Sequence, residues 1–277
     1  MHSTIEYVYC VVPASALPSV ADGAPPGIDG GEVRRIVVGD IAALVSTLDS
    51  AGYVPDAVAE CVLDPEWLTP RAVAHDTMVT WASDVGPVVP LPMWVMFANS
   101  EGVAAMLETR GALLRKEIGV VRGAREYGVR VSGDRNVLAD AVMSLDPELA
   151  ALEQQAQAAS PGQAYLLRRK LAVARKQSAR DAVGRVASEI HAVLTDVARA
   201  SAIRSRQNAD GGGQPNLILD GAYLVADEQY DDFRLALTQL IQRYGASETA
   251  AQAGSMAGCD FEFTGPWPPY HFVRGNE

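Results

Sequence analysis

The C-terminal run of residues 261–273 constrains the fold more than any other stretch, because three prolines follow directly on a strand pattern. At its start, phenylalanines alternate with polar residues, which predicts a strand. Pro266, Pro268 and Pro269 then fix φ and remove backbone donors, so neither a helix nor a central strand can continue through them. The run therefore predicts a strand that ends in a stiff, extended strap.

The strap carries three aromatic residues, Trp267, Tyr270 and Phe272, and each buries a large area when it docks. The simpler hypothesis is that the strap packs on its own domain and closes a core. The alternative is a proline-rich ligand for the aromatic groove of a partner. The strap has no repeated PxxP motif and follows a strand directly, which favours packing on its own domain.

The 277 residues are enough for one large domain or two ordinary ones, and 48% hydrophobic with 21% charged residues is a globular composition. The net charge of −11 argues against nucleic acid as a partner. Three isolated cysteines form neither a disulfide framework nor a zinc site, which fits a reduced, cytoplasmic setting. We expect no signal peptide and no membrane span, because no sufficiently long apolar run occurs.

The first part of the chain alternates strands with helices, which predicts an α+β domain over residues 1–134. The obvious candidate is a ferredoxin-like arrangement. Within it, prolines demote the segment 87–97 to an edge strand or a broken strand. The expected strands are 5–12, 33–38, 41–46, 87–97 and 126–131, and the expected helices are 65–83 and 100–118.

A second α+β domain is predicted over residues 135–277, which includes the strap. Its main feature is a helix that begins at Ser160-Pro161 and runs to about Arg204, a length of roughly 60 Å at 1.5 Å per residue. Residues 136–157, which precede it, are helix formers, and Pro147 marks an expected restart of the helix. A strand over 217–225, a helix to about Tyr244 and the final strand follow it.

The long helix carries a basic stretch that includes Arg168 and Arg169. It is either a solvated helix face or a docking face for acidic surface on this molecule or on a partner. Glu126 is the candidate for a buried salt bridge between the domains. Together with Trp267 and Tyr270, these residues form the predicted structural set.

Signals for catalysis are weak. His75 and Asp76 are adjacent in a predicted helix, so their side chains point about 100° apart and do not form a dyad by themselves. The other histidines show no ligand spacing, and no P-loop or nucleophile elbow occurs. We therefore expect no catalytic, cofactor-binding or metal-binding residues and no enzyme.

Several blocks in order along the chain resemble the gas vesicle GvpF/GvpL family. The C-terminal block from Gly265 to Val273 is the most specific, since nine residues rich in Trp and Pro match the family's signature. The other blocks are Tyr7–Val12, His75 with Val89–Leu91, Glu126–Val131, Ser160–Lys170 and Asn216–Val225. One departure stands out: where the family has Arg-Phe-Gly after Pro-Leu, this chain has Pro92-Met93-Trp94.

The resemblance implies a ferredoxin-like N-terminal domain and a C-terminal α+β domain with a long helix. It also implies an accessory role in gas vesicle shell assembly, in contact with the small hydrophobic shell protein GvpA and with other Gvp accessory proteins. The implied location is the cytoplasm and the gas vesicle.

The candidate contact residues for a partner are Met93, Trp94, Met96 and Phe97, an apolar segment on the proline-broken edge strand. Simple burial in the core is the alternative. A rival function is a ligand-binding or enzymatic module on ferredoxin-like domains. That function would need a polar pocket that holds His75, Asp76 and Arg71.

Overall fold

The computed structural model divides into two compact units, Met1–Glu126 with Pro266–Glu277 (the first unit) and Tyr127–Gly265 (the second unit). The predicted bounds of 1–134 and 135–277 differ from this division in two places. Residues 127–134 belong with the second unit, and the strap belongs with the first. The structure describes residues 4–16, 23–134, 137–138, 147–204, 216–245 and 258–273.

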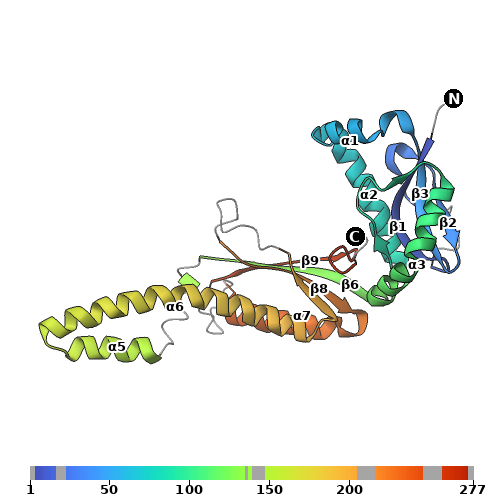
Figure 1. Cartoon of the computed structure of the whole chain (residues 1–277). Coiled ribbons are helices and arrows are strands. Elements are labelled where there is room, and N and C mark those ends of the chain that lie inside the picture. Colours follow the sequence, from blue (N-terminus) through green and yellow to red (C-terminus); the bar gives the residue numbers. More distant parts are fainter. Residues whose placement is uncertain are drawn as a thin grey trace. The chain divides into compact units, whose positions relative to one another are not determined.

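The first unit contains a five-stranded antiparallel sheet in the order β2-β3-β1-β4, with β5 also paired to β1 (Figure 1). The predicted hairpin around Gly39-Asp40 is confirmed, since Val38 pairs with Ile41. The predicted strand over 87–97 is broken into two short pieces at the sheet edge. The strands are β1 (Thr4–Pro13), β2 (Val33–Val38), β3 (Ile41–Asp49), β4 (Val89–Pro90) and β5 (Met96–Phe97).

Helices α2 and α3 of the first unit begin where their capping residues predict. The Asp64 carboxylate accepts from the backbone N–H of Glu66, and the Asn99 side chain accepts from that of Gly102. The elements are η1 (Ile28–Gly30), η2 (Ser50–Gly52), α1 (Pro55–Cys61), α2 (Pro65–Val85) and α3 (Ser100–Val121).

Both faces of this sheet are buried. Tyr7 and Tyr9 of β1 belong to the core that includes Met78 of α2, whereas Val8 belongs to the core that includes Leu107 of α3. A bulge between Val8 and Cys10 adjusts which side chains face each core. The α+β class is therefore confirmed. The ferredoxin-like detail stays a prediction, because helices pack on both faces and the segment between β1 and β2 carries η1 in its described part.

The second unit contains a four-stranded sheet in the order β7-β8-β6-β9. The expectation that the last strand ends before Pro266 is wrong, because β9 continues to Trp267. An edge strand tolerates proline, since the missing N–H is not needed for the ladder. The strands are β6 (Ala124–Ser132), β7 (Ala200–Ile203), β8 (Leu217–Ala226) and β9 (Asp260–Trp267).

The long helix is real but shorter than predicted. It ends at Asp196 rather than near Arg204, and residues 200–203 pair antiparallel with β8. No proline or glycine marks this end, so local propensity alone favours a longer helix, and strand pairing overrides it. The elements are α5 (Pro147–Ala158), α6 (Pro161–Asp196), η3 (Asp227–Gln229) and α7 (Tyr230–Tyr244).

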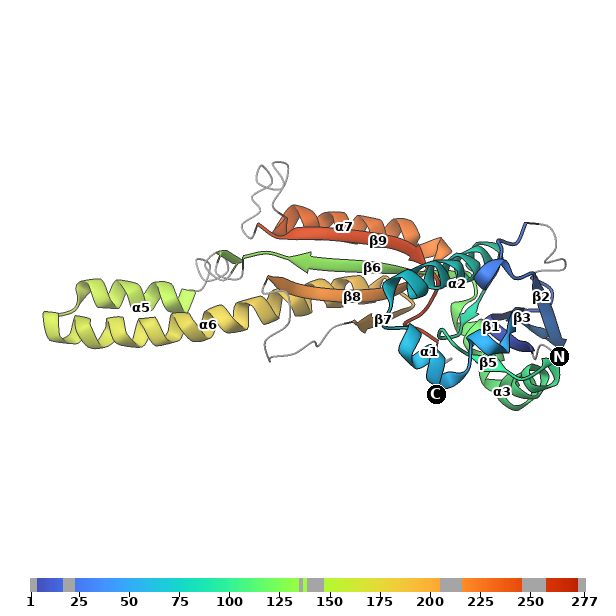
Figure 2. The same cartoon turned by 90° about the horizontal axis from the view of Figure 1, so that it is seen from above.

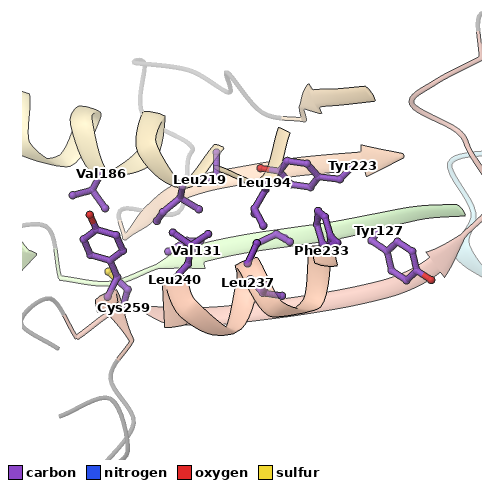
Figure 3. Packing of buried hydrophobic residues seen from close by; sticks show 14 of the residues in the cluster. Tyr127, Val131, Val186, Leu194, Leu219, Tyr223, Phe233, Leu237, Leu240 and Cys259 are labelled. Carbon is purple, nitrogen blue, oxygen red and sulfur yellow. The ribbon is translucent and has the colours of Figure 1, made fainter. Parts of the chain in front are cut away.

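A single core joins α6 and α7 to one face of this sheet (Figure 3). Leu194 of α6 and Leu237 of α7 meet Tyr223 of β8 and Val131 of β6 in this core. The other face carries charge. Asp220 forms ion pairs with Arg204 at 3.1 Å and with Arg130 at 3.5 Å.

The N-terminal part of α6 extends past the end of the sheet and packs on α5 as a helical hairpin (Figure 2). Ala164 and Leu171 of α6 and Leu149 and Ala156 of α5 are buried. Arg175 of α6 also pairs with Glu153 of α5 at 3.0 Å.

Candidate functional site

A cluster of aromatic side chains lies under the loop between β4 and β5. Trp94 stacks on Trp67 of α2 with ring centroids 5.2 Å apart and meets Tyr7 edge-on at 6.0 Å. The backbone N–H of Trp94 donates to the Tyr7 hydroxyl at 3.3 Å. Such pairs add stabilisation beyond the area they bury, so this loop is anchored to the core by Trp94.

Trp94 has a φ of 71°, which lies in the left-handed region. A non-glycine residue in this region costs on the order of 1–2 kcal/mol. In the resemblance to the GvpF/GvpL family, this position corresponds to the glycine of Arg-Phe-Gly. The loop therefore keeps a backbone shape that suits glycine, and here the aromatic contacts of Trp94 offset the strain.

His75 of α2 is buried beside this cluster. Its Nδ1 lies 2.8 Å from the Tyr7 hydroxyl, and the ring also bonds the backbone of Leu91. Burial lowers the pKa of His75 to about 4, against which the Leu91 bond and the Asp76 charge act only in part. His75 is therefore neutral at pH 7 and holds the strand-to-helix packing together.

A cavity of about 320 Å³ opens beside His75 in the first unit. Asp76 contributes a carboxylate to the cavity wall. The Tyr270 hydroxyl donates a hydrogen bond to Asp76 Oδ1 at 3.0 Å. Burial and the Asp76 carboxylate raise the pKa of Tyr270. The remaining lining is largely apolar, so the cavity suits an apolar side chain better than a charged ligand. The lining residues are Ala72, His75, Asp76, Pro90, Leu91, Pro92, Met93, Tyr270 and Val273.

The strap forms one wall of this cavity. Pro268 and Pro269 are buried, and Val273 packs against the core of the α3 face. His271 binds the Glu126 carboxylate twice, through its backbone N–H at 3.0 Å and its Nδ1 at 2.6 Å. The strap therefore packs on the first unit, rather than on the C-terminal domain of residues 135–277 to which the sequence assigned it.

The rival function would need Arg71 to join His75 and Asp76 in a polar pocket, but Arg71 does not line the cavity. Its guanidinium stands 4.3 Å from the Trp67 ring centroid and pairs with Asp29 at 2.9 Å. It also donates to the Tyr53 hydroxyl at 2.9 Å, and that hydroxyl bonds Asp29. Burial, chiefly, raises the pKa of Tyr53 to about 12. Through these bonds, Arg71 of α2 holds Asp29 of η1 and Tyr53 against the helix.

The four predicted contact residues are partly buried in the first unit. Met93 lines the cavity and Trp94 is held in the aromatic cluster. Met96 packs on the core of the α2 face and Phe97 on that of the α3 face. Their role in binding a partner stays a prediction, and Met93 is the one placed on the cavity wall.

The predicted structural residues lie in different places. Glu126 is 1% exposed and is engaged by His271, while Arg168 and Arg169 are exposed on α6. Trp267 and Tyr270 are 44% and 40% exposed. Their role between the domains stays a prediction.

Sequence reasoning missed two contacts of the strap, His271 with Glu126 and Tyr270 with Asp76. A signal was present, because an acidic residue within a strand pattern needs a partner when buried. The sequence did not indicate which residue would pair with it.

Within the described ranges, no group of three or more histidine, cysteine or acidic side chains is placed to hold a metal ion. None of the helices in these ranges is long and apolar enough to cross a membrane.

Comparisons with known proteins cover nearly the whole chain. The model of the family "Gas vesicle synthesis protein GvpL/GvpF" matches residues 6–274. Gas vesicle protein L2 of Halobacterium salinarum is 28% identical, over 96% of this chain and 90% of that protein. Gas vesicle protein L of a Streptomyces species is 27% identical, over 97% and 92%.

Two crystal structures share the fold. GvpF from Anabaena has a TM-score of 0.64 at 16% identity, over 98% of this chain and 99% of that one. GvpF from Microcystis aeruginosa has a TM-score of 0.61 at 14% identity, over 97% and 98%. The chain therefore belongs to the gas vesicle synthesis protein GvpL/GvpF family.

Proposed function

We propose that this protein is a gas vesicle accessory protein that acts in shell assembly by binding the shell protein GvpA. The observation that carries the proposal is the family match over residues 6–274, with near full-length relatives named gas vesicle protein L. Family membership implies a role in gas vesicle formation. The proposed setting is the cytoplasm at the growing vesicle, with other Gvp accessory proteins as further partners.

The cavity of the first unit is the proposed contact site. It lies where the edge strand breaks. Its lining mixes the methionine and proline side chains of this break with the polar groups of His75, Asp76 and Tyr270. A volume of about 320 Å³ has room for an apolar side chain of a hydrophobic partner. The strained loop at Trp94 supports this proposal, because strain tends to be kept at functional positions.

The proposed role is not catalytic. A general base must reach the proton it takes. In this cavity, His75 is already bonded to Tyr7 and to the backbone of Leu91, and Asp76 already accepts from Tyr270. Because His75 and Asp76 already have partners within the protein, neither is left free to exchange a proton with a substrate.

A ligand-binding or enzymatic module is the second candidate, favoured by the one cavity wall that holds both His75 and Asp76. An Asp76→Asn variant separates the two candidates. If this variant folds and still captures GvpA but no longer supports vesicles, chemistry at the cavity becomes the better explanation.

Capture of GvpA tests the main proposal. The full chain and GvpA are co-expressed, and the GvpA that copurifies is measured for Met93→Asp and for Leu63→Asp, a control at a side chain that is 82% exposed. We expect at least a fivefold loss for Met93→Asp and none for Leu63→Asp, since only Met93 lines the cavity.

Equal capture by both variants would remove the cavity as the contact site. Absence of GvpA capture by the unaltered chain would reject GvpA as the partner. Deletion of the gene in a vesicle-forming host tests the wider role, and normal vesicles in that host would contradict it.

A further inference from the structure

The helical hairpin of α5 and α6 has an apolar face that nothing in the described structure covers. Tyr165, Leu166 and Val173 of α6 are 67%, 64% and 67% exposed. At 100° per residue, these three side chains fall within about 100° of arc on one side of the helix. They form a stripe rather than scattered exposed positions.

This stripe lies roughly opposite the side of α6 that packs on α5. Ala164 and Leu171 on that inner side are buried, and they are about 150° and 170° from the centre of the stripe by helical rotation. A surface helix normally has one apolar side. A helix with a second apolar side, on which Leu166 and Val173 are seven residues apart, has the pattern of a bundle helix packed between two neighbours.

Exposed cations surround the stripe. Arg168, Arg169 and Lys170 are all exposed, and Arg169 lies four residues after Tyr165 and four before Val173. Helical residues four apart are neighbours on the surface. The stripe is therefore apolar with a basic centre and flank, on a chain whose net charge is −11.

We propose that this stripe, defined by Tyr165, Leu166, Arg169 and Val173, binds an amphipathic helix of another protein whose apolar face is flanked by Asp and Glu. Such a helix would complete a three-helix bundle with α5 and α6. Its carboxylates would pair with the cations around the stripe, which gives orientation as well as contact.

Two other occupants fit less well. A second copy of this chain would bring the same cations of α6 against each other in the most direct pairing, which is repulsive. If the stripe inserted into a membrane surface, Arg169 at its centre would enter the apolar layer as well, and a cation there is costly. A carboxylate of a partner helix satisfies that cation directly.

Binding of designed peptides to the full chain tests the proposal. One labelled 21-residue helical peptide has Leu at the a and d heptad positions and Glu at e and g, and the matched peptide has Lys in place of Glu. We expect the Glu peptide to bind at least tenfold more tightly by fluorescence anisotropy. Its affinity should fall as salt rises, because exposed charges are screened.

Variants of the chain locate the site. The double variant Leu166→Asp, Val173→Asp should lose at least tenfold in affinity for the Glu peptide. The double variant Arg168→Glu, Arg169→Glu should reverse the preference toward the Lys peptide. Leu235→Asp on α7, at a side chain that is 58% exposed, is the matched control and should bind as the unaltered chain does. Circular dichroism checks that each variant keeps its helices.

Each contrary result overturns the proposal. Equal affinity for the two peptides, no binding of either, or an equal loss in the Leu235→Asp control would reject the acidic helix. A dimer in sedimentation that Leu166→Asp disperses would assign the stripe to a second copy. Binding to vesicles of phosphatidylglycerol and phosphatidylcholine that Leu166→Asp removes would assign it to a membrane. None of these outcomes depends on GvpA.

Discussion

The two sheets of this protein differ in how their faces are covered. The sheet of the first unit is buried on both faces, with α2 on one side and α3 on the other. The sheet of the second unit has one apolar face under α6 and α7, and charged residues such as Arg130 and Asp220 on the other. Antiparallel sheets allow either solution. The difference means that a polar substitution should have a very different cost in the two units.

The two units also share a hydrogen-bonded pair of side chains. In each, a tyrosine of a central strand meets a helix histidine: Tyr7 and His75 are 2.8 Å apart in the first, and Tyr223 and His191 are 3.0 Å apart in the second. Burial lowers the pKa of both histidines. His75 is 5% exposed, whereas His191 is only partly buried, so the same pair is more sheltered where the sheet is covered twice.

The largest expected effect comes from changing the charge on one face of each sheet, namely the face toward α3 in the first unit and the charged face in the second. Ala43→Asp in β3 buries a carboxylate among Val8 and Leu107, and we expect a loss of about 4 kcal/mol or more in the free energy of unfolding, or no folding. Glu262→Lys in β9 removes an exposed ion pair with Arg130 and should cost less than about 1 kcal/mol. Urea denaturation followed by circular dichroism measures both. Similar losses for the two variants would break the comparison.

The next effect is a pH dependence. The pKa of His75 is about 4 in the folded chain and 6.5 when unfolded, so the unfolded state binds a proton that the folded state cannot. Stability should therefore be highest above pH 6.5 and fall by about 3 kcal/mol as the pH drops to 4. His75→Gln should remove this slope, and His191→Gln should remove a smaller one.

Denaturation curves at a series of pH values between 4 and 8 check both slopes. A His75→Gln variant that keeps the full slope of the unaltered chain would show that His75 is not the sheltered group. Equal reductions in the two variants would remove the difference between the units.

The smallest effect concerns backbone strain. Among described residues, the non-glycine positions with left-handed φ, Asp29 and Trp94, lie in the first unit, while in the second unit such positions are glycines, including Gly258 with φ 57°. Trp94→Gly and Trp94→Ala both lose the stacking, but the glycine variant should be about 1 kcal/mol more stable. Gly258→Ala, with open space around the added methyl group, should lose about 1 kcal/mol. Thermal unfolding measures these differences, and a more stable Trp94→Ala would contradict them.

The parts of the fold with local signals could be predicted from the sequence. Capping residues predicted the starts of α2 and α3 at Asp64 and Asn99, and the Gly39-Asp40 turn predicted a hairpin. The end of α6 could not be predicted in this way. Residues 197–204 have no helix breaker, and their change to β7 depends on pairing with β8, which is a distant contact.

The candidate site was only partly predictable for the same reason. The break in the edge strand and the residue Met93 follow from the prolines. The cavity needs Tyr270 and Val273, nearly 200 residues from Asp76, and no local pattern links them. The conformation of Trp94 was also not predictable. The resemblance to the family indicates that Trp94 replaces a glycine, but only the φ of 71° explains why a glycine suits this position.

The unbroken course of α6 has a mechanical consequence. Its 36 residues join the hairpin to the core of the second unit, and Ile190 and Leu194 at its far end are fully buried. A continuous helix of this length behaves as a stiff rod of about 54 Å. A displacement of the hairpin near Leu166 is therefore transmitted along the helix toward Ile190, which lies in the core under the sheet.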